Sequence, residues 1–209
     1  MIGNGAPARI RRIDPGGCSR RFLVGFGLAY TALAALVPAA SRASETVTDT
    51  NVVTVEVFSA SGKSLGLAHL PKVVKSDAEW LKQLTPLAFG VTRRGATERA
   101  GTGLYANSRD DGLYRCICCG TALFDSATKF PYEGWPSFYR PISSYNVVKS
   151  EDRGFGMRRT AVSCTLCDAH LGHVFADGPP PTGQRYCIDS AALRFVPRSA
   201  DQAMQGNPP

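Results

Sequence analysis

The sequence lacks the charge excess that its composition first suggests. The 209-residue chain has 24 Lys and Arg residues against 17 Asp and Glu, but residues 1–43 hold six of the bases and only one of the acids. The remainder has 18 bases and 16 acids, a net charge of +2. A basic surface that binds nucleic acid is therefore excluded as the basis of function.

The chain also lacks internal repeats and low-complexity segments, which excludes a solenoid or another repeat architecture. Histidine is scarce as well: the chain has three, and two of them lie within four positions of each other. Its hydrophobic content of 44% is enough for one domain with a packed core. Residues that can take part in catalysis are therefore few and lie close together in the sequence.

The first 43 residues have the layout of a signal peptide. Residues 22–37 carry no charge, Ser19-Arg-Arg21 precedes them, and Ser41-Arg-Ala43 offers a small-x-small cleavage pattern. The paired arginines resemble the twin-arginine signal, which exports folded proteins across a bacterial inner membrane. We therefore expect a periplasmic protein without a stable membrane anchor after cleavage. An uncleaved anchor is the alternative, because an apolar run of about 16 residues is near the lower limit for a span.

The rest of the chain divides into an extension, a domain and a tail. Residues 44–73 are expected to form an N-terminal extension, in which alternation over residues 52–58 favours a strand and turn, as in an added hairpin. Residues 198–209 are expected to be a disordered tail. The domain between them, residues 74–197, begins with a capping-box sequence at Ser76 that predicts a helix over residues 77–84.

A second short helix is predicted over residues 87–94, ended by Gly95. From Gly101 onward, short β-type runs are broken by Gly, Pro, Asn and Asp. They include residues 113–115, 121–124, 145–149, 160–162 and 192–196. This pattern is typical of an antiparallel all-β body.

Two Cys-x-x-Cys units predict a metal site. Cys116 and Cys119 form one unit, and Cys164 and Cys167 form the other. Two such turns supply four thiolates at tetrahedral angles, which is the usual donor set of structural Zn²⁺ and leaves no open position for substrate. A pair of disulfides is the alternative in an exported protein. Cys118 lies off the repeated spacing and is expected to be a spare thiol, although it is an alternative ligand to Cys119.

Cys187 is the candidate nucleophile. It has no cysteine nearby and follows Arg185 by two residues, so that a fixed positive charge favours its thiolate. The alternative is a small buried hydrophobic residue, as isolated cysteines in β-runs often are. His170 and His173 favour the reactive thiol, because they can accept or donate protons near neutral pH and, three residues apart on a turn or helix, share a face.

Several sequence blocks occur together and in one order. They are Ser76-Asp-Ala-Glu-Trp-x-x-x-Leu-Thr-Pro86, Thr97-Glu-Arg99, Gly134-Trp-Pro-Ser-Phe138, Cys164-x-x-Cys167 with His170-Leu-Gly-His-Val-Phe175, Asp177-Gly-Pro-x-Pro-Thr-Gly183 and Arg185-Tyr-Cys-Ile188. In this combination the chain resembles the B-type peptide-methionine (R)-S-oxide reductases, over about residues 74–197. The resemblance implies two antiparallel β-sheets with short N-terminal helices, and one structural zinc held by both Cys-x-x-Cys units.

The resemblance also implies the chemistry. Cys187 matches the catalytic cysteine, which attacks the sulfur of methionine-R-sulfoxide and becomes a sulfenic acid. His173 and His170 match the residues that handle the proton, and Arg185 is expected to assist thiolate formation. The indole of Trp135 is expected to pack on the substrate's ε-methyl group, with Phe138 as a second substrate-binding residue. The implied partners are oxidised proteins or peptides and a thioredoxin-like or other thiol reductant.

Three positions depart from the pattern of that family. Asp189 stands where an Asn is common, and an ionised carboxylate only accepts hydrogen bonds. Asp189 must therefore be protonated to act as a catalytic donor. Glu133 occupies the usual place of a resolving cysteine, and Thr102 lies at or near a second such place. We therefore expect an external thiol to reduce the sulfenic acid directly, with Cys118 as the only internal candidate.

Two other readings predict different observations. A zinc-stabilised binding module of the same fold would recognise a protein without chemistry, but it has no need of a nucleophile, an acid and an apolar methyl pocket together. A disulfide-rich secreted structural domain predicts no metal and no free thiol. The sequence therefore favours an oxidoreductase that repairs oxidised protein.

Overall fold

The computed structural model describes residues 51–198, which form a mainly β protein. The predicted signal peptide, the start of the extension and nearly all of the predicted tail lie outside these residues. The described strands are β1 (Val52–Phe58), β2 (Ser64–Pro71), β3 (Gly112–Cys116), β4 (Ala122–Asp125), β5 (Lys129–Phe130), β6 (Ser137–Phe138), β7 (Val147–Asp152), β8 (Arg159–Cys164), β9 (His170–Phe175), β10 (Arg185–Ile188) and β11 (Leu193–Pro197). Short helical turns connect them: η1 (Ser126–Thr128), η2 (Ser144–Asn146), η3 (Gly154–Gly156) and η4 (Ser190–Ala192).

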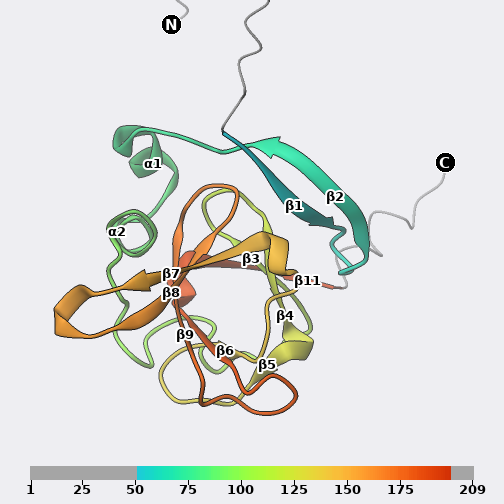
Figure 1. Cartoon of the computed structure of the whole chain (residues 1–209), viewed down its shortest axis with the longest axis vertical. Helices are drawn as coiled ribbons and strands as arrows, with labels where there is room; N and C mark the ends of the chain where they lie inside the picture. Colours follow the sequence, from blue (N-terminus) through green and yellow to red (C-terminus); the bar gives the residue numbers. More distant parts are fainter. Residues whose placement is uncertain (1–50, 199–209) are drawn as a thin grey trace, which may run out of the picture. The chain divides into compact units, whose positions relative to one another are not determined.

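The strands form three antiparallel sheets. One sheet has six strands in the order β5-β6-β10-β9-β8-β7, and another has three in the order β11-β3-β4. These two sheets confirm the predicted fold class. The hairpin β1-β2 is a separate two-stranded sheet beside the body (Figure 1). The sequence suggested a hairpin in the N-terminal extension but set no bounds for its second strand, β2.

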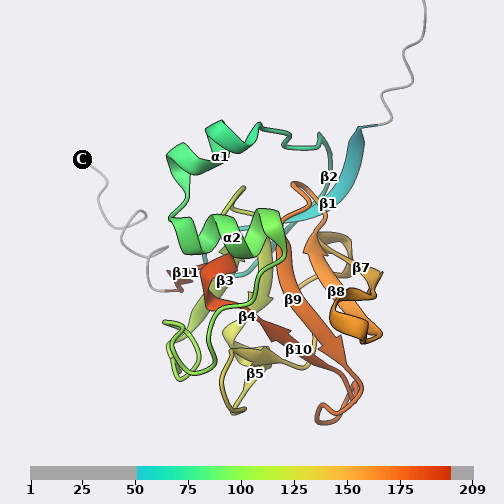
Figure 2. The ribbon, with the colours of Figure 1, turned by 90° about the vertical axis from the view of Figure 1, so that its left-hand side faces the viewer.

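Both predicted helices are present, and each differs from its predicted bounds by one residue at one end. Ser76 caps α1 (Asp77–Gln83), and the Glu79 side chain accepts a hydrogen bond from the Ser76 backbone, which completes the capping box. Gly95 ends α2 (Pro86–Arg94) in the left-handed conformation. Caps of this kind contribute about 0.5–2 kcal/mol to helix stability. Helix α2 packs against β9 and η4 (Figure 2).

The core fills the space between the two larger sheets. Phe124 and Phe138 stack with their ring centroids 4.5 Å apart, and Tyr114 meets Phe138 at 5.1 Å in an edge-on arrangement. All three side chains are fully buried. Phe138 is therefore a core residue, and its predicted contact with substrate is wrong. Its neighbour Ser137 faces the opposite side of the strand, since successive side chains of a strand alternate.

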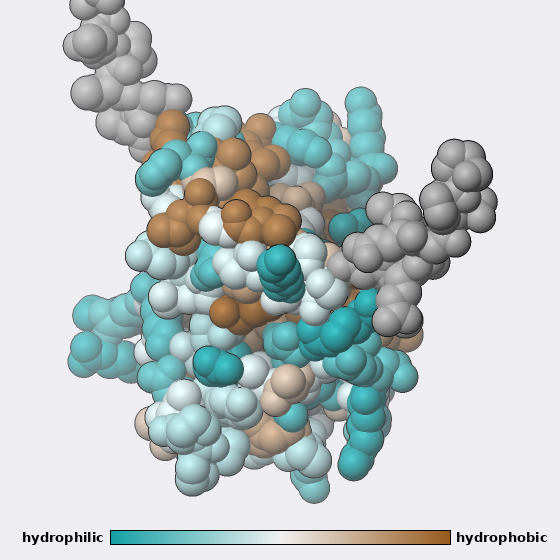
Figure 3. Space-filling model, turned by 90° about the vertical axis from the view of Figure 1, so that its right-hand side faces the viewer, coloured by the Kyte–Doolittle hydropathy of each residue, from teal (hydrophilic) through white to brown (hydrophobic). Residues whose placement is uncertain are grey.

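One of the ties between the hairpin and the body is a buried side chain. Asn146 donates hydrogen bonds to the carbonyl oxygens of Glu56 and Ala122, and its own side-chain oxygen accepts from the Glu56 backbone, all at 2.8 Å. The outer part of the hairpin exposes apolar side chains, including Leu65 and Leu67, and Figure 3 shows apolar surface on this face. No helix within residues 51–198 is long and apolar enough to cross a membrane.

Candidate active site and metal centre

The two Cys-x-x-Cys units fold into matching turns. In each unit, the residue after the second cysteine has a positive φ and donates its backbone N–H to the carbonyl oxygen of the first cysteine at 2.9 Å. Gly120 takes this position in the first turn and Asp168 in the second, with φ values of 80° and 55°. The fold-back brings both thiols of a unit to one side of the chain. The spacing of the cysteines predicted this geometry.

The four thiols meet at one point. The Sγ atoms of Cys116, Cys119, Cys164 and Cys167 all lie within 4.8 Å of one another. Two of the cross pairs, Cys116 with Cys167 and Cys119 with Cys164, are 3.6 Å apart. These distances are too long for disulfides, and the six described cysteines are free thiols. A tetrahedron of sulfurs at the Zn–S distance of about 2.3 Å has edges of about 3.8 Å, so the cluster fits a single ion.

The cluster joins the two larger sheets. The first turn connects β3 to β4 in the three-stranded sheet, and the second connects β8 to β9 in the six-stranded sheet. Arg93 of α2 donates to the Cys167 carbonyl at 2.8 Å, and Lys72 at the end of the hairpin pairs with Asp168 at 2.6 Å. A bound ion here would fix the relative position of the sheets. Cys118 is buried nearby but is not part of the four-thiol group.

Cys187 lies in a row of side chains that crosses the six-stranded sheet. It pairs with Ser137 of β6 on one side and with His173 of β9 on the other. Residues directly opposite each other in an antiparallel pair project from the same face. Its neighbours Tyr186 and Ile188 are buried on the core face, while Cys187 is half-buried on the other. The candidate nucleophile and the candidate proton carrier are thus adjacent.

A β-bulge brings the two histidines together. Val162 of β8 pairs with Gly172, whereas the adjacent Ser163 pairs with His170, so β9 carries an extra residue at this point. The rings of His170 and His173 are 5.3 Å apart as a result. The prediction of a turn or helix for them was wrong, although the shared face is correct. At Gly172 an added Cβ would lie 2.1 Å from the carbonyl oxygen of Cys187, so this close approach of β9 to β10 requires glycine.

Asp152 fixes the protonation pattern of His173. Its Oδ2 atom lies 2.8 Å from Nε2 of His173, and Arg159 donates to the same oxygen at 2.7 Å. The backbone N–H of Gly154, His173 and Arg159 lower the pKa of Asp152 to about 2, so its carboxylate is ionised and can only accept. Nε2 of His173 therefore carries a proton. Nδ1 is left as the nitrogen that exchanges one.

The other histidine is neutral near pH 7. Burial, followed by the proximity of His173, lowers the pKa of His170 to about 4. Its Nε2 has no hydrogen-bond partner among residues 51–198. The expectation that both histidines titrate near neutrality is therefore wrong for His170. As a neutral ring it can orient a polar group but does not supply a positive charge.

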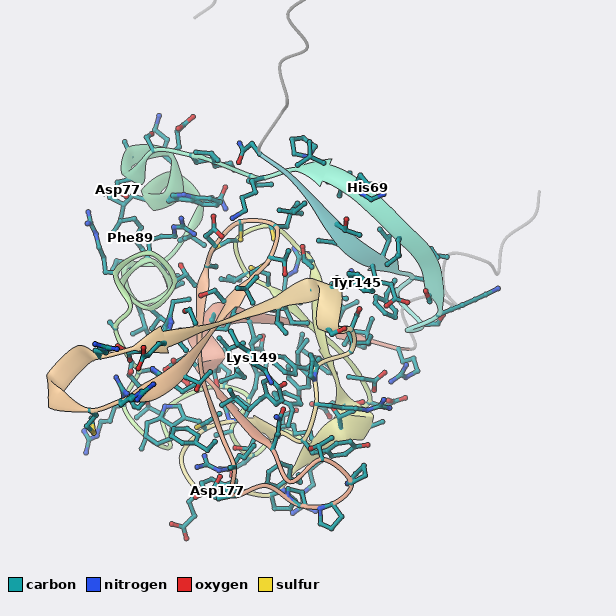
Figure 4. All side chains as sticks on the ribbon, viewed as in Figure 1. His69, Asp77, Phe89, Tyr145, Lys149 and Asp177 are labelled. Atoms are coloured by element: carbon teal, nitrogen blue, oxygen red, sulfur yellow. The ribbon has the colours of Figure 1, made fainter. Side chains whose placement is uncertain are left out.

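Arg185 lies near Cys187 and also contacts two other side chains. It makes two hydrogen bonds of 2.9 Å to the carboxylate of Asp177, and its guanidinium lies 4.0 Å from the ring centroid of Tyr132. Burial raises the pKa of the Cys187 thiol, and Arg185 opposes that rise only in part. The predicted effect of Arg185 has the correct sign, but burial outweighs it. Figure 4 places Asp177 at the end of the body away from His69 of the hairpin.

Asp189, Glu98 and Trp135 form a second linked group. Oδ1 of Asp189 accepts the backbone N–H of Glu98 at 2.8 Å, and the Glu98 carbonyl accepts Nε1 of Trp135 at 3.2 Å. The buried Glu98 carboxylate accepts the backbone N–H groups of Ser190 and Ala191. Burial, reinforced by the charge of Glu98, raises the pKa of Asp189 to about 7. Asp189 is thus partly protonated at neutral pH.

Sequence reasoning missed two members of these networks. Asp152 belongs to the charged end of the β7–β8 hairpin, and nothing in its local sequence marks it as a partner of a histidine 21 residues away. Glu98 lay within a recognised block, but without an assigned role. Glu133 and Thr102, at the places of the absent resolving cysteines, are both exposed.

Comparison with known proteins identifies the family. Residues 84–197 match the SelR domain model. The chain is 55% identical over 128 residues to the peptide methionine sulfoxide reductase MsrB of Methylibium petroleiphilum, covering 61% of this chain and 93% of that protein. It is 53% and 52% identical to the MsrB proteins of Pseudomonas fluorescens and Pseudomonas syringae, with 62% of this chain and 99% and 100% of theirs covered. The chain belongs to the MsrB family of peptide methionine sulfoxide reductases.

Membership of the MsrB family establishes the general activity of the protein. The protein is an oxidoreductase that reduces methionine sulfoxide, a reaction that repairs oxidised methionine. The alternative of a non-catalytic binding module is not favoured. A thiol reductant is implied as the source of electrons.

Proposed function

We propose that the protein reduces methionine-R-sulfoxide through a sulfenic acid on Cys187. The observation that carries this proposal is the pairing of Cys187 with His173 across β9 and β10, on the face of the sheet opposite Tyr186 and Ile188. The thiolate of Cys187 attacks the sulfoxide sulfur, and the S–O bond breaks as the oxygen moves to the cysteine sulfur. Methionine is released with its sulfur reduced by two electrons, and Cys187 is oxidised to the sulfenic acid.

His173 supplies the proton that the departing oxygen requires. Asp152 holds the protonated Nε2, so Nδ1 is the nitrogen through which His173 passes a proton to the oxygen. The neutral His170 beside it completes the polar wall of the site. Trp135, held through Nε1 by the Glu98 carbonyl, presents its ring to the ε-methyl group. Arg185 and Asp177 brace the side of the site next to Cys187.

An external thiol completes the cycle. It attacks the sulfenic sulfur of Cys187 and releases water, and a second thiol resolves the mixed disulfide and restores the thiolate. Cys118 lies in the turn between β3 and β4, in the other sheet from Cys187, which supports reduction from outside the chain. A thioredoxin-like protein fits this requirement.

We also propose zinc as the ion of the four-cysteine cluster and the periplasm as the compartment. Zinc, when bound by Cys116, Cys119, Cys164 and Cys167, supplies a structural clamp with no open coordination position. The sulfur-only donor set and the 3.6 Å spacings support it. The export signal in residues 1–43 supports the periplasm, and fractionation of cells that express the full chain is its test.

The stereochemical part of the proposal is tested with two peptides that differ only at the sulfoxide. With dithiothreitol as reductant, we expect the R diastereomer to be converted and the S diastereomer to remain. Chromatography of the peptide products measures both reactions. Consumption of the S form alone would contradict the proposed specificity. Conversion of neither peptide by protein of full metal content would contradict the catalytic assignment itself.

The pH dependence of the reaction is expected to depend on Asp189. Below about pH 7 its carboxyl is protonated, and the proton on Oδ2 can be donated while Oδ1 accepts from Glu98. Above that pH it is ionised, loses the donor and also raises the pKa of Cys187. Because the thiolate population rises with pH, wild-type kcat/KM should rise and then level off near pH 7. In Asp189→Asn it should continue to rise, since an amide donates at every pH.

The profiles of the two proteins are compared from pH 5.5 to pH 9.5 with the peptide substrate. Identical profiles would show that Asp189 has no part in the pH dependence. The matched control is Asp77→Asn, which removes an exposed carboxylate on α1, outside the two networks around Cys187. Its profile should follow that of the wild type.

A further inference from the structure

An open cavity of about 660 Å³ lies next to the candidate active site. Residues 106–110 form one wall, and residues 129–133 form the other, with Ser126 between them. A cavity of this size lies within the range of about 300–1,000 Å³ that accommodates ligands larger than one side chain. Neither Cys187 nor Trp135 is among its lining residues, so the cavity is additional to the site that contains the reacting atoms.

Three connections place this cavity beside the site. Tyr132 lines it and at the same time stacks on the Arg185 guanidinium at 4.0 Å. Phe130 lines it and pairs with Ser137, the residue that pairs in turn with Cys187. Glu133 lines it two residues before Trp135 along the chain. A polypeptide in the cavity therefore lies beside the strands that carry the residues of the candidate site.

The chemistry of the walls fits a polypeptide better than a charged small molecule. The lining carries two basic side chains, Arg109 and Lys129, and two acidic ones, Asp110 and Glu133, so that it has no net charge. The Lys129 amine is already engaged by the carbonyl oxygens of Ala106 and Ser108 at 3.1 and 2.6 Å. The Phe130 and Tyr132 rings, 6.4 Å apart, offer flat apolar contacts that tolerate different side chains.

We propose that this cavity binds the polypeptide segment next to the oxidised methionine of a protein substrate. The inference rests on the proposed role of Cys187, and it adds a binding site outside the reaction centre. Contacts made there are equally strong in the ground state and the transition state, because the atoms that react lie elsewhere. Such contacts lower KM for a peptide and leave kcat nearly unchanged.

The test narrows the cavity with a large side chain, placed at a lining residue that has no role in the reaction. Asn107 is exposed and lines the cavity, so Asn107→Trp narrows it with little risk to folding. Arg109→Trp, at a second exposed lining position, repeats the test independently. Lys82→Trp on α1 is the matched control, since it adds the same side chain to an exposed site outside the lining. The substrates are a nonapeptide with a central methionine-R-sulfoxide and the blocked single residue, N-acetyl-methionine-R-sulfoxide amide, each with dithiothreitol.

We expect kcat/KM for the nonapeptide to fall about tenfold in both cavity variants, mainly through KM, as when one good binding contact is lost. The blocked single residue should be reduced at the wild-type rate by all four proteins. An equal loss with both substrates, or no loss with either, would overturn the proposal. A loss seen only when thioredoxin replaces dithiothreitol would overturn it too, and would assign the cavity to the reductant. Failure of the wild type on both substrates would instead contradict the proposed function.

Discussion

Cys187→Ser is expected to abolish reduction of methionine-R-sulfoxide while leaving the fold intact. Serine is close in size to cysteine at this half-buried position, so the packing around β10 changes little. Its hydroxyl is far less acidic than a thiol, and it cannot form the sulfur–oxygen intermediate. Turnover of the R-sulfoxide peptide with dithiothreitol is the measurement. The variant should show only the rate of the thiol alone.

The matched control for this variant is Cys118→Ser, which removes the other thiol outside the four-cysteine group among residues 51–198. It should retain wild-type turnover. Equal activity of wild type and Cys187→Ser would remove Cys187 as the nucleophile. Mass spectrometry of protein treated with substrate in the absence of reductant should find a trappable sulfenic acid on Cys187. A disulfide between Cys118 and Cys187 would contradict direct reduction by an external thiol.

Cys164→Ser is expected to release the metal and to destabilise the whole domain. Structural Zn²⁺ sites contribute roughly 10–16 kcal/mol of apparent binding free energy, which exceeds the total stability of many domains. The loss should be large because Cys164 ends β8 and its turn helps connect the two sheets. Metal content by mass spectrometry and the thermal unfolding midpoint are the measurements. Less than one equivalent of zinc and loss of cooperative unfolding are expected.

Chelation offers the same test without a mutation. Wild-type protein exposed to a strong chelator should lose its zinc and its cooperative transition together, and the addition of zinc should restore both. Cys118→Ser is again the control, because it replaces a buried cysteine next to the cluster and keeps all four thiols of the cluster. A metal-free protein with an unchanged unfolding midpoint would contradict the structural role. Stoichiometric iron in place of zinc would contradict the assignment of the ion.

Local signals in the sequence were sufficient for some parts of the structure. The capping box at Ser76 and the left-handed Gly95 mark the ends of helices, because these signals act within one turn of chain. The Cys-x-x-Cys spacing likewise contains the geometry of its own turn. The four-cysteine group follows from chemistry rather than from topology, since four thiolates are needed to complete one coordination shell.

Parts of the site that depend on strand register could not be predicted. The bulge in β9 that aligns His170 with His173 arises from how β8 and β9 pair. No local pattern in the amino-acid sequence predicts it. The contact between Asp152 and His173 depends on the same pairing. Phe138 was misassigned because the block that contains it also contains Trp135, although alternation along β6 directs Phe138 into the core. The shift of Asp189 required burial to be known, because its local sequence contains no nearby acid.

The position of Cys187 in an interior strand limits the order of events in catalysis. Strands β6 and β9 flank it on both sides, and the opposite face of β10 is buried, so its sulfur can be approached from one side only. Oxidised substrate and reducing thiol must therefore use the same entrance in turn. With Cys187 as the proposed nucleophile, methionine has to leave before the reductant can reach the sulfenic acid. We therefore expect ping-pong kinetics, in which the oxidised substrate reacts with the thiolate form of the enzyme and the reductant with the sulfenic acid form.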